Sequence, residues 1–286
     1  MQEAAIMDCD DFSVSIVIRA FDEERYIGHC VNAINNQKCS IPFEVLVIDS
    51  GSLDRTVDIS KGLGARVIHL KKEDFSFGYA LNKGINNAKN KIIVVVSAHC
   101  LPVSEHWLEN LIFPIYSGDA DLTFGAQISD PNARCSEFNY FRKKYSFDHI
   151  QSLPLEKSFN NANSAFLRSS WVEVKFDERI EAQEDILFAT KLTSLGKKIK
   201  YVNSAAVIHY HNFTNRKLFK RIYIDTKYNK FVGVYSDGGT NLFNNFYFGI
   251  YSDIRLAFKR NVLLSAFPGI IFFRVIEFLA AYKALL

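Results

Sequence analysis

Short runs of β-branched and aliphatic residues alternate with amphipathic segments over the first hundred residues. The apolar runs lie at 14–18, 43–48, 66–70 and 92–96. The segments between them have helical apolar spacing, as in Ile27, Val31 and Ile34, or lie at 53–62 and 78–88. Strands that are apolar on both faces and separated by helices form parallel sheets covered on both sides. The pattern therefore predicts an α/β fold in which ligands bind beyond the carboxyl ends of the strands.

Polar loops follow three of these strands, at 19–24, 49–56 and 97–102. Carboxylates accept hydrogen bonds, so Asp49 and Asp54 are suited to the N–H and O–H donors of a nucleotide base and ribose. Alternatively, Ser52 or Asp54 caps the helix that follows, and the two roles are compatible. No G-x-G-x-x-G or G-x-x-x-x-G-K-[ST] phosphate loop is present, which disfavours dehydrogenases and P-loop ATPases. A nucleotide held through carboxylates and a cation fits better.

Two polar features of the second half suggest a carboxylate base and metal-binding imidazoles. The sequence Gln-Glu-Asp at 183–185 opens an apolar-periodic helix that Gly196 ends, and His209 and His211 follow a short strand. Residues i and i+2 of an extended segment point the same way, so both imidazoles can face one pocket. The alternatives are a structural role for either histidine and, for the two carboxylates, stabilisation of a helix N-terminus.

Composition narrows the class of protein. The chain has 286 residues, 48% of them hydrophobic, and a net charge of +3, too balanced for nucleic acid as the main partner. Its five cysteines (Cys9, Cys30, Cys39, Cys100 and Cys135) lack C-x-x-C pairing, which disfavours a disulfide framework or zinc finger and favours a reducing cytosol. The acidic N-terminal tail, residues 1–12, does not resemble a signal peptide, so export is not expected.

Several ordered motifs resemble the inverting family 2 glycosyltransferases with the GT-A fold. Segment 15–24 is similar to the family's first strand and nucleotide loop, and 47–57 to its second strand and acidic loop. Segment 77–84 and the pair 176–178 and 184–185 are similar to two later motifs. The resemblance extends over about 13–214. It implies a GT-A (Rossmann-like) three-layer α/β fold with a mostly parallel central sheet, plus a C-terminal helical extension.

The resemblance also implies a reaction and roles for residues. A sugar would pass from a nucleotide diphosphate sugar to an acceptor hydroxyl, with inversion at the anomeric carbon. Asp185 would be the general base, and Glu184 would orient the acceptor or the base. The expected nucleotide-sugar contacts are Arg19, Phe21, Glu23, Asp49, Ser50, Asp54, Lys83, Ser97 and Ala98.

One motif departs from the family pattern. Many members carry Asp-x-Asp after the fourth strand, where this chain has Ser97, Ala98 and His99. His99 would then be a metal ligand, with His211 the closer match to the family's ligating histidine and His209 a further candidate. Imidazole favours Mn²⁺ over Mg²⁺ as the divalent cation. The missing carboxylates keep an alternative open, a non-catalytic nucleotide-sugar binding protein.

The last third differs in character from the rest. A helix expected from Thr214 to Phe231 carries a basic stripe, and the apolar stretch after Lys259 and Arg260 is interrupted by Pro268 and by charges. This stretch is not expected to span a bilayer, because spanning takes about 20 predominantly apolar residues. Attachment in the plane of an anionic membrane surface is expected. The alternative is packing on the catalytic domain or in a homodimer.

These expectations combine into one hypothesis. It is a cytoplasmic enzyme, peripheral on the inner face of the cell membrane, with a tail (1–12), a GT-A domain (13–213) and a helical region (214–286). Its donor would be a UDP- or dTDP-sugar and its acceptor a saccharide or lipid-linked saccharide, in cell-surface polysaccharide or lipid-linked oligosaccharide synthesis. Segment 209–214 is similar to rhamnosyltransferase-like members. The amides of 160–166, expected to precede a strand, hold sugar hydroxyls or form an ordinary turn.

Overall fold

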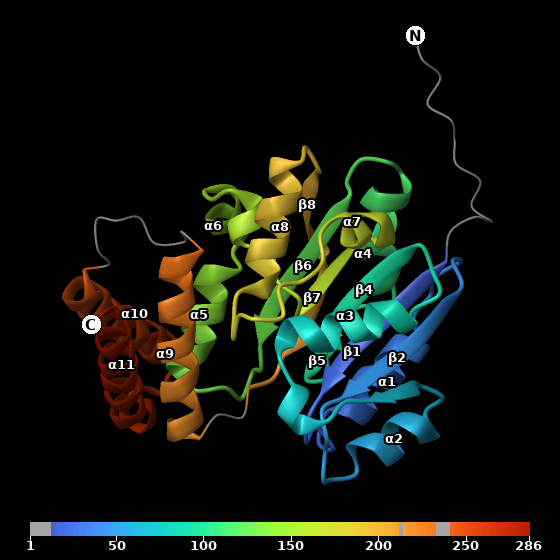
Figure 1. Ribbon diagram of the computed structural model, residues 1–286. Helices are drawn as coiled ribbons and strands as arrows, with labels where there is room; N and C mark the ends of the chain where they lie inside the picture. Colours follow the sequence, from blue (N-terminus) through green and yellow to red (C-terminus); the bar gives the residue numbers. More distant parts are fainter. Residues whose placement is uncertain (1–12, 212–213, 233–240) are drawn as a thin grey trace. The chain divides into compact units, whose positions relative to one another are not determined.

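The computed structural model describes residues 13–211, 214–232 and 241–286 (Figure 1). The predicted N-terminal tail with Cys9, and Asn212 and Phe213 of the histidine segment, lie outside the described residues. The chain forms two compact units. The first comprises the residues up to Gln127, Ile150–Ile180 and Glu184–His209, and the second comprises Ile128–His149, Glu181–Gln183 and Tyr210–Leu286.

Eight strands form one sheet in the order β3-β2-β1-β4-β7-β6-β8-β5. Their bounds are Val14–Ala20 (β1), Phe43–Asp49 (β2), Arg66–His69 (β3), Ile92–Ser97 (β4), Cys100–Pro102 (β5), Leu122–Ser129 (β6), Asn163–Leu167 (β7) and Ile199–His209 (β8). The strands β3, β2, β1 and β4 pair in parallel, as the alternating pattern predicted. Antiparallel pairing begins where β7 joins β4 and continues between β6 and β7 and between β5 and β8.

The helices of the first unit connect and cover these strands (Figure 1). They are Ile27–Asn35 (α1), Thr56–Gly62 (α2), Phe77–Asn87 (α3), Trp107–Tyr116 (α4), Arg168–Glu173 (α7) and Glu184–Ser194 (α8), with 3₁₀ turns at Lys72–Asp74 and Leu155–Lys157. The helix predicted at 53–62 begins only at Thr56, because the three residues before it belong to the polar loop. Gly196, with φ 84°, lies just beyond α8, as expected for a helix end.

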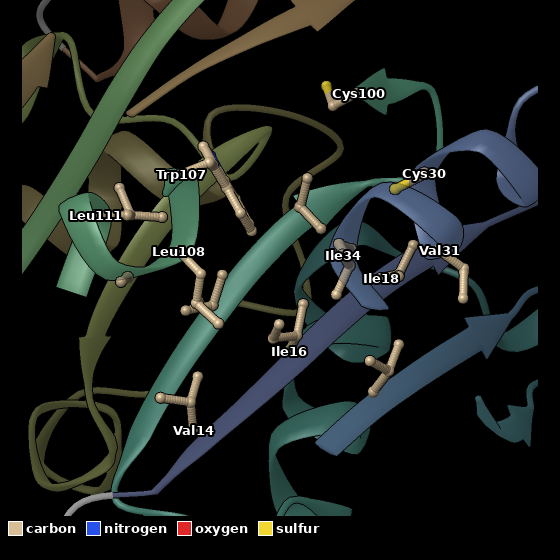
Figure 2. Close-up of a cluster of buried hydrophobic side chains, with 14 of the residues drawn as sticks. Val14, Ile16, Ile18, Cys30, Val31, Ile34, Cys100, Trp107, Leu108 and Leu111 are labelled. Atoms are coloured by element: carbon tan, nitrogen blue, oxygen red, sulfur yellow. The ribbon is translucent and has the colours of Figure 1, made fainter. Parts of the chain in front are cut away.

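Both faces of the central strands β1 and β4 are buried, as their apolar pattern predicted. Alternate residues of β1, such as Ile16 and Ile18, pack with α1 and α4 in the cluster of Figure 2, which includes Trp107. Val17, between them, packs on the other face with α3, α7 and α8. Because helices cover both faces of these strands, the loops at the strand ends are the places left for ligands.

Two segments expected to be loops contain strands. Cys100–Pro102 forms β5 and pairs with Val207–His209 of β8, and β7 begins at Asn163, inside the asparagine-rich segment. The expectation that this segment only precedes a strand was therefore wrong. Asn163 is fully buried, and its amide donates to the carbonyls of Ala126 and Ala205. A polar side chain is accommodated inside the sheet here because neighbouring strands satisfy its hydrogen bonds.

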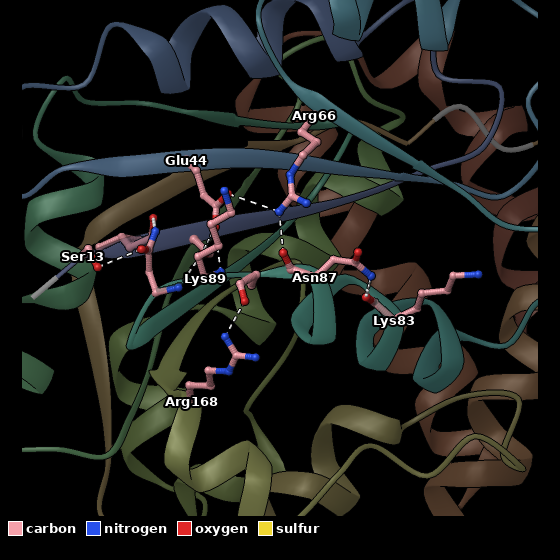
Figure 3. A network of polar contacts seen from close by, with 11 residues as sticks. Ser13, Glu44, Arg66, Lys83, Asn87, Lys89 and Arg168 are labelled. Carbon is pink, nitrogen blue, oxygen red and sulfur yellow. Dashed lines mark hydrogen bonds and ion pairs between the residues drawn. The ribbon is translucent and has the colours of Figure 1, made fainter.

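A polar network closes the amino ends of the parallel strands (Figure 3). The carboxylate of Glu44 accepts from the Ser15 hydroxyl at 2.7 Å and the Lys89 backbone N–H at 2.9 Å, and it pairs with Arg66 at 3.3 Å. Burial opposes ionisation of Glu44, but these donors outweigh burial and lower its pKa. The network is structural and lies at the strand ends opposite to those that carry the predicted site.

The core cysteines are thiols that we expect to be unreactive. Cys30 and Cys100 belong to the cluster of Figure 2, and burial, with the charge of Glu23 adding to it, raises the pKa of Cys30 to about 12. Because the thiolate is the reactive form, iodoacetamide at pH 8 is expected to leave both thiols unmodified in the native protein. It should alkylate both after unfolding in guanidinium, as measured by peptide mass spectrometry. Rapid alkylation of either thiol in the native protein would mean that these side chains are not buried in solution.

The second unit is helical. It contains Cys135–Lys144 (α5), most of Phe147–Gln151 (α6), Asn215–Phe231 (α9), Leu242–Lys259 (α10) and Leu263–Leu285 (α11). Thr214 caps α9 by accepting from the N–H of Lys217, close to the predicted start of this helix. The basic stripe expected on α9 is exposed, at Lys217, Lys220, Arg221 and Lys227, whereas Leu218 is buried.

The view of Pro268 as an interruption was wrong, because α11 is continuous through it. A proline lacks the N–H that would bond the carbonyl four residues earlier. That residue is Leu264, which is 94% exposed, so water can satisfy the carbonyl. Within the described residues, α11 is the one helix whose length and apolar composition would suffice to cross a membrane, and 22% of its apolar window is buried.

A buried ion pair links the last two helices. Asp253 of α10 is fully buried and accepts from Arg274 of α11 at 2.8 and 3.0 Å, and from the Asn139 amide of α5 at 2.7 Å. Arg274 also contacts Glu277 at 2.5 Å. A Cβ atom at Gly249 would come within 2.9 Å of the guanidinium, so glycine leaves the space that the arginine occupies. The charges are thus satisfied inside the helical unit.

Candidate functional site

Two loops at the carboxyl ends of β1 and β2 are joined by hydrogen bonds between backbone and side chains. The N–H groups of Asp22, Glu23 and Glu24 donate to Ser52, Thr56 and Asp54 at 2.9, 2.7 and 2.9 Å. In the reverse direction, the N–H groups of Leu53 and Arg55 donate to Asp22 and Glu24 at 2.9 and 3.2 Å. The first and second motifs of the sequence therefore form one structural feature of the first unit.

The two aspartates of the second loop shape the loop itself. Asp49 is buried and accepts from the N–H groups of Gly51 and Ser52 at 3.2 and 3.1 Å, and from His69 Nδ1 at 3.3 Å. Asp54 accepts from the hydroxyl and N–H of Thr56, but the N-cap position of α2 is Arg55, so Asp54 bonds the start of the helix from one residue before the cap. Burial raises the pKa of Asp54, but the bonds from Thr56 and Glu24 outweigh it and lower the pKa overall. A role for these aspartates in nucleotide binding stays a prediction.

The other residues predicted to contact the nucleotide sugar differ in how exposed they are. Phe21 is 41% exposed, and the ammonium group of Lys72 lies 5.0 Å from its ring centroid. Ser97 and Ala98 are buried at the end of β4, and Ser50 is buried beside Ala20. Lys83 lies on α3, one turn before Asn87, whose amide donates to its carbonyl (Figure 3). Exposure thus favours Phe21 over the buried side chains for a direct ligand contact.

Two of the three predicted metal ligands lie together in the first unit. His99 follows β4 and His209 ends β8, and the antiparallel pairing of β5 with β8 brings them together. Their rings stack with centroids 5.0 Å apart and an interplanar angle of 26°. One ligand atom from each lies within 4.8 Å of the other. Two neighbouring imidazoles offer nitrogen ligands, which first-row transition metals bind more readily than Mg²⁺ does.

Each of these imidazoles has an oxygen acceptor at Nδ1. For His99 it is Glu23 Oε1 at 2.6 Å, and for His209 it is Gln127 Oε1 at 2.5 Å. Glu23 was predicted as a nucleotide contact, and here it contacts a candidate ligand. Gln127 was missed by sequence reasoning, although a glutamine among small and apolar residues of a buried strand signals a required hydrogen-bond partner.

His211 belongs to the second unit, two residues along the chain from His209. Two peptide units span at most about 7.6 Å, so its backbone is close to that of His209 by covalent connection alone. Its ring contacts Phe141 of α5, with centroids 5.3 Å apart. Its role as a ligand stays a prediction.

The two carboxylates at the start of α8 have different surroundings. Glu184 is buried and pairs with Arg19 at 3.4 Å, and the Arg19 guanidinium lies 4.7 Å from the Phe77 ring centroid. Asp185 is partly exposed and accepts from the backbone N–H of Asn161 at 3.2 Å and from that of Ile186 at 2.8 Å. The paired, buried Glu184 is suited to hold a position, and Asp185 is the more accessible carboxylate.

The asparagines 160 and 161 connect this carboxylate to the imidazoles. Asn160 Oδ1 accepts from Gln127 Nε2 at 2.5 Å, and Gln127 contacts His209. The next residue, Asn161, bonds Asp185 through its N–H and is buried, and its side-chain nitrogen has no hydrogen-bond partner among the residues that the structure describes. A buried amide nitrogen without a partner is costly, and a ligand oxygen could satisfy it.

Asn82 connects two of the family-like segments, 77–84 and 176–178, through hydrogen bonds. Its amide donates to the Phe176 carbonyl at 2.9 Å and to Glu178 at 2.8 Å, and its oxygen accepts from Trp171 at 2.8 Å. A Cβ atom at Gly78 would lie 2.3 Å from the Asp177 carbonyl oxygen, so glycine permits the close approach. These residues secure the segment that leads toward α8.

Strained backbone also concentrates near the carboxylates and the first loop. Among the described residues, the non-glycine positions with positive φ are Asp22 (52°), Gln183 (64°) and Asn261 (55°). Asp22 lies in the loop after β1, and Gln183 directly precedes Glu184. Strained residues are enriched at active and binding sites, which is consistent with the positions of these two.

Comparison with known proteins supports the resemblance. The model of the family described as Glycosyl transferase family 2 matches residues 15–175. The O-antigen chain rhamnosyltransferase RfbN of Salmonella typhimurium is 26% identical over 74% of this chain and 71% of its own length. The O-antigen chain rhamnosyltransferase WbaN of Salmonella anatum is 27% identical over 65% of this chain and 62% of its own length.

Solved structures share the fold. The mannosyltransferase PcManGT from Pyrobaculum calidifontis, in complex with GDP-Man and Mn²⁺, has a TM-score of 0.63 at 15% identity and covers 96% of this chain and 87% of its own. Glucosyl-3-phosphoglycerate synthase from Mycobacterium tuberculosis, with Mn²⁺, UDP and glucosyl-3-phosphoglycerate, has a TM-score of 0.59 at 18% identity, covering 80% and 83%. The expected GT-A fold is confirmed, and with the family match, this chain is a glycosyltransferase that belongs to glycosyl transferase family 2.

Proposed function

We propose that this protein is an inverting glycosyltransferase that uses a nucleotide diphosphate sugar, with Asp185 as its general base. The observation that carries the proposal is the chain of contacts within the first unit. Consecutive asparagines join Asp185 to Gln127, which holds His209 beside His99. A series of contacts thus links a candidate base to candidate metal ligands, which supports a common site for the two.

The reaction needs a base because an acceptor hydroxyl is a poor nucleophile at neutral pH. The proton of the hydroxyl passes to the Asp185 carboxylate while its oxygen forms a bond to the anomeric carbon. The bond from that carbon to the diphosphate breaks, and its electron pair leaves with the nucleoside diphosphate. Two backbone N–H groups hold the Asp185 carboxylate in place, and the buried Glu184–Arg19 pair sets the first turn of α8.

A divalent cation would be held by His99 and His209, with His211 as the third ligand by its position in the sequence. When bound, it would neutralise the negative charge that develops on the leaving diphosphate. The imidazole donors favour Mn²⁺ over Mg²⁺. This positive charge would come from the cation, because the side chains of Ser97 and Ala98 carry none.

The substrates are proposed from the relatives. Two similar proteins are named O-antigen chain rhamnosyltransferases, and one from Methanococcus voltae, 24% identical, is named for transfer to a dolichyl-phosphate-linked sugar. We therefore propose a UDP- or dTDP-sugar donor and a saccharide or lipid-linked acceptor in cell-surface polysaccharide or lipid-linked oligosaccharide synthesis.

The test is release of nucleoside diphosphate from UDP- and dTDP-sugars, with Mn²⁺, Mg²⁺ or chelator, before and after addition of lipid-linked saccharide. Release that requires acceptor supports a transferase. Thermal stabilisation by one nucleotide without acceptor-dependent release would instead indicate a nucleotide-sugar binding protein that does not turn over. Transfer that persists in chelator would rule out the metal role.

We also propose that the helical unit attaches to the cytoplasmic surface of the membrane. The exposed side chains of α10 include Phe243, Tyr247, Tyr251 and Phe258, whose spacing places them on one arc of the helix. Exposed cations, Lys259 and Arg260, follow this aromatic stripe. An apolar face with adjoining cations suits an anionic lipid surface. Arg274, paired inside the unit, favours attachment in the plane over a spanning arrangement.

The double variant Phe243→Glu/Phe258→Glu is expected to lose cosedimentation with vesicles of phosphatidylcholine and phosphatidylglycerol. It removes apolar contact and adds charge repelled by the lipid. Phe113→Glu is the control, because Phe113 is also exposed, at 51%, but lies on α4. Equal sedimentation of all three proteins would contradict attachment through α10. Loss of a wild-type dimer in the double variant, by sedimentation velocity, would instead identify the aromatic stripe as a homodimer interface.

A further inference from the structure

The same nitrogen is engaged in both stacked imidazoles. Nδ1 of His99 bonds a carboxylate oxygen of Glu23, and Nδ1 of His209 bonds the amide oxygen of Gln127. The four side chains come from different parts of the chain, the loop after β1, the segment after β4, and the strands β6 and β8. In both contacts the oxygen accepts and the ring nitrogen donates, for reasons that differ between the two histidines.

Glu23 fixes the direction of the first contact. An ionised carboxylate can only accept hydrogen bonds, so His99 Nδ1 must carry the proton. The side chains of Glu23 and His99 are 19% and 28% exposed, so the bond is shielded from most of the solvent.

A series of amides fixes the direction of the second contact. The carbonyl of Ser158 can only accept, and it accepts from Asn160 Nδ2 at 3.3 Å. Asn160 therefore presents Oδ1 to Gln127, which donates through Nε2 at 2.5 Å. Gln127 is left with Oε1 toward His209, so His209 Nδ1 donates the proton. The orientation of each amide follows from the backbone carbonyl at the start of the series.

A neutral imidazole carries one N–H, so a proton on Nδ1 leaves the lone pair on Nε2. We infer that Glu23, Gln127 and Asn160 are positioning residues that hold His99 and His209 as Nδ1–H tautomers, which makes Nε2 the metal-ligating atom of both. The metal role rests on the proposed function, whereas the tautomers follow from the hydrogen bonds alone.

This arrangement offers a reason why the chain can lack the Asp-x-Asp carboxylates. A ligating histidine that donates its other N–H to an oxygen acceptor is oriented and made more basic by that acceptor. Glu23 therefore contributes its negative charge through His99, not by direct ligation. Glu23, predicted from the sequence as a nucleotide contact, is thus assigned the role of supporting a metal ligand.

The first test is Mn²⁺ affinity, measured by calorimetry on the full chain in the presence of UDP. Gln127→Met removes the acceptor at similar side-chain length and should weaken Mn²⁺ binding by about 10- to 100-fold. Gln127→Glu keeps an acceptor for His209 and should retain most of the affinity. Gln37→Met is the matched control, because the Gln37 amide bonds Ala33, Ser104 and Leu108 and is not in contact with the imidazoles.

The second test needs no variant. Long-range ¹H–¹⁵N NMR of the metal-free wild type at pH 8, with ¹⁵N-labelled histidine, should show Nε2 unprotonated in His99 and His209. An Nε2–H tautomer in either ring, or equal Mn²⁺ affinity of Gln127→Met and Gln37→Met, would overturn the inference. A wild type that binds no Mn²⁺ would overturn the proposed metal site, and the spectra would then show separately whether the tautomers are as inferred.

Discussion

Replacement of Asp185 by asparagine is expected to lower kcat by about 10²- to 10⁴-fold, the usual contribution of a general base. Asparagine keeps the size of the side chain and one acceptor oxygen, but it cannot take the proton of the acceptor hydroxyl. Binding of UDP and Mn²⁺ should be unchanged, because the proposed ligands and nucleotide loops are elsewhere in the sequence. The measurement is single-turnover sugar transfer at saturating donor and acceptor.

Asp58→Asn separates this role from helix stabilisation. Asp58 also lies in the first turn of a helix, α2, and is exposed. If carboxylates in these positions act only on the helix dipole, both variants should lose about 0.3–1 kcal/mol of stability and keep their activity. A catalytic Asp185 predicts a large loss of turnover in that variant alone. Wild-type kcat in Asp185→Asn would remove the residue from the chemistry.

Loss of the buried arginine of the helical unit is expected to have the largest effect on stability. Arg274→Met leaves the fully buried Asp253 carboxylate without its cation, which costs about 3–5 kcal/mol in buried pairs. The free energy of unfolding can be measured by denaturant titration, with circular dichroism as the signal. The double variant Asp253→Leu/Arg274→Met should recover much of this loss, because neither charge then remains buried and unpaired.

The control for this prediction is Arg221→Met on α9. Arg221 pairs with Asp225 at 2.8 Å, but its side chain is 51% exposed, and exposed pairs contribute at most about 1 kcal/mol. A cost for Arg274→Met no larger than for Arg221→Met would mean that water reaches Asp253 in solution. It would also weaken the case for in-plane attachment of α11, which uses the internal pairing of Arg274.

Local patterns predicted the first half of the fold well. Strands such as Ile92–Ser97 are apolar on both faces, and that alone implies a sheet between two layers of helices. The expected start of a helix at Thr214 and the helix end marked by Gly196 were also close to the bounds found. Pro268 misled, because whether a proline interrupts a helix depends on what satisfies the carbonyl four residues earlier, and exposure of Leu264 is a tertiary property.

The candidate site was predicted in its residue types but not in its contacts. Asp185, Glu184 and the histidines could be singled out because a family motif or a two-residue spacing marks them. Gln127 could not, because its partners, Asn160 and His209, are distant in the sequence and reach it only through the order of the strands. The pairing of β5 with β8, which brings His99 to His209, is equally non-local.

Periodicity and residue type along the chain were enough to predict the α/β architecture, the polar loops at the strand ends and the kinds of chemical groups available there. Which of these groups come into contact depends on how the chain packs. Glu184 lies next to Arg19 because the chain packs both side chains into the interior. Glu23 and Gln127 contact the two imidazoles because of the order of the strands that carry them. A hydrogen bond depends on distance and direction between side chains, and for residues far apart in sequence the packed sheet alone sets both.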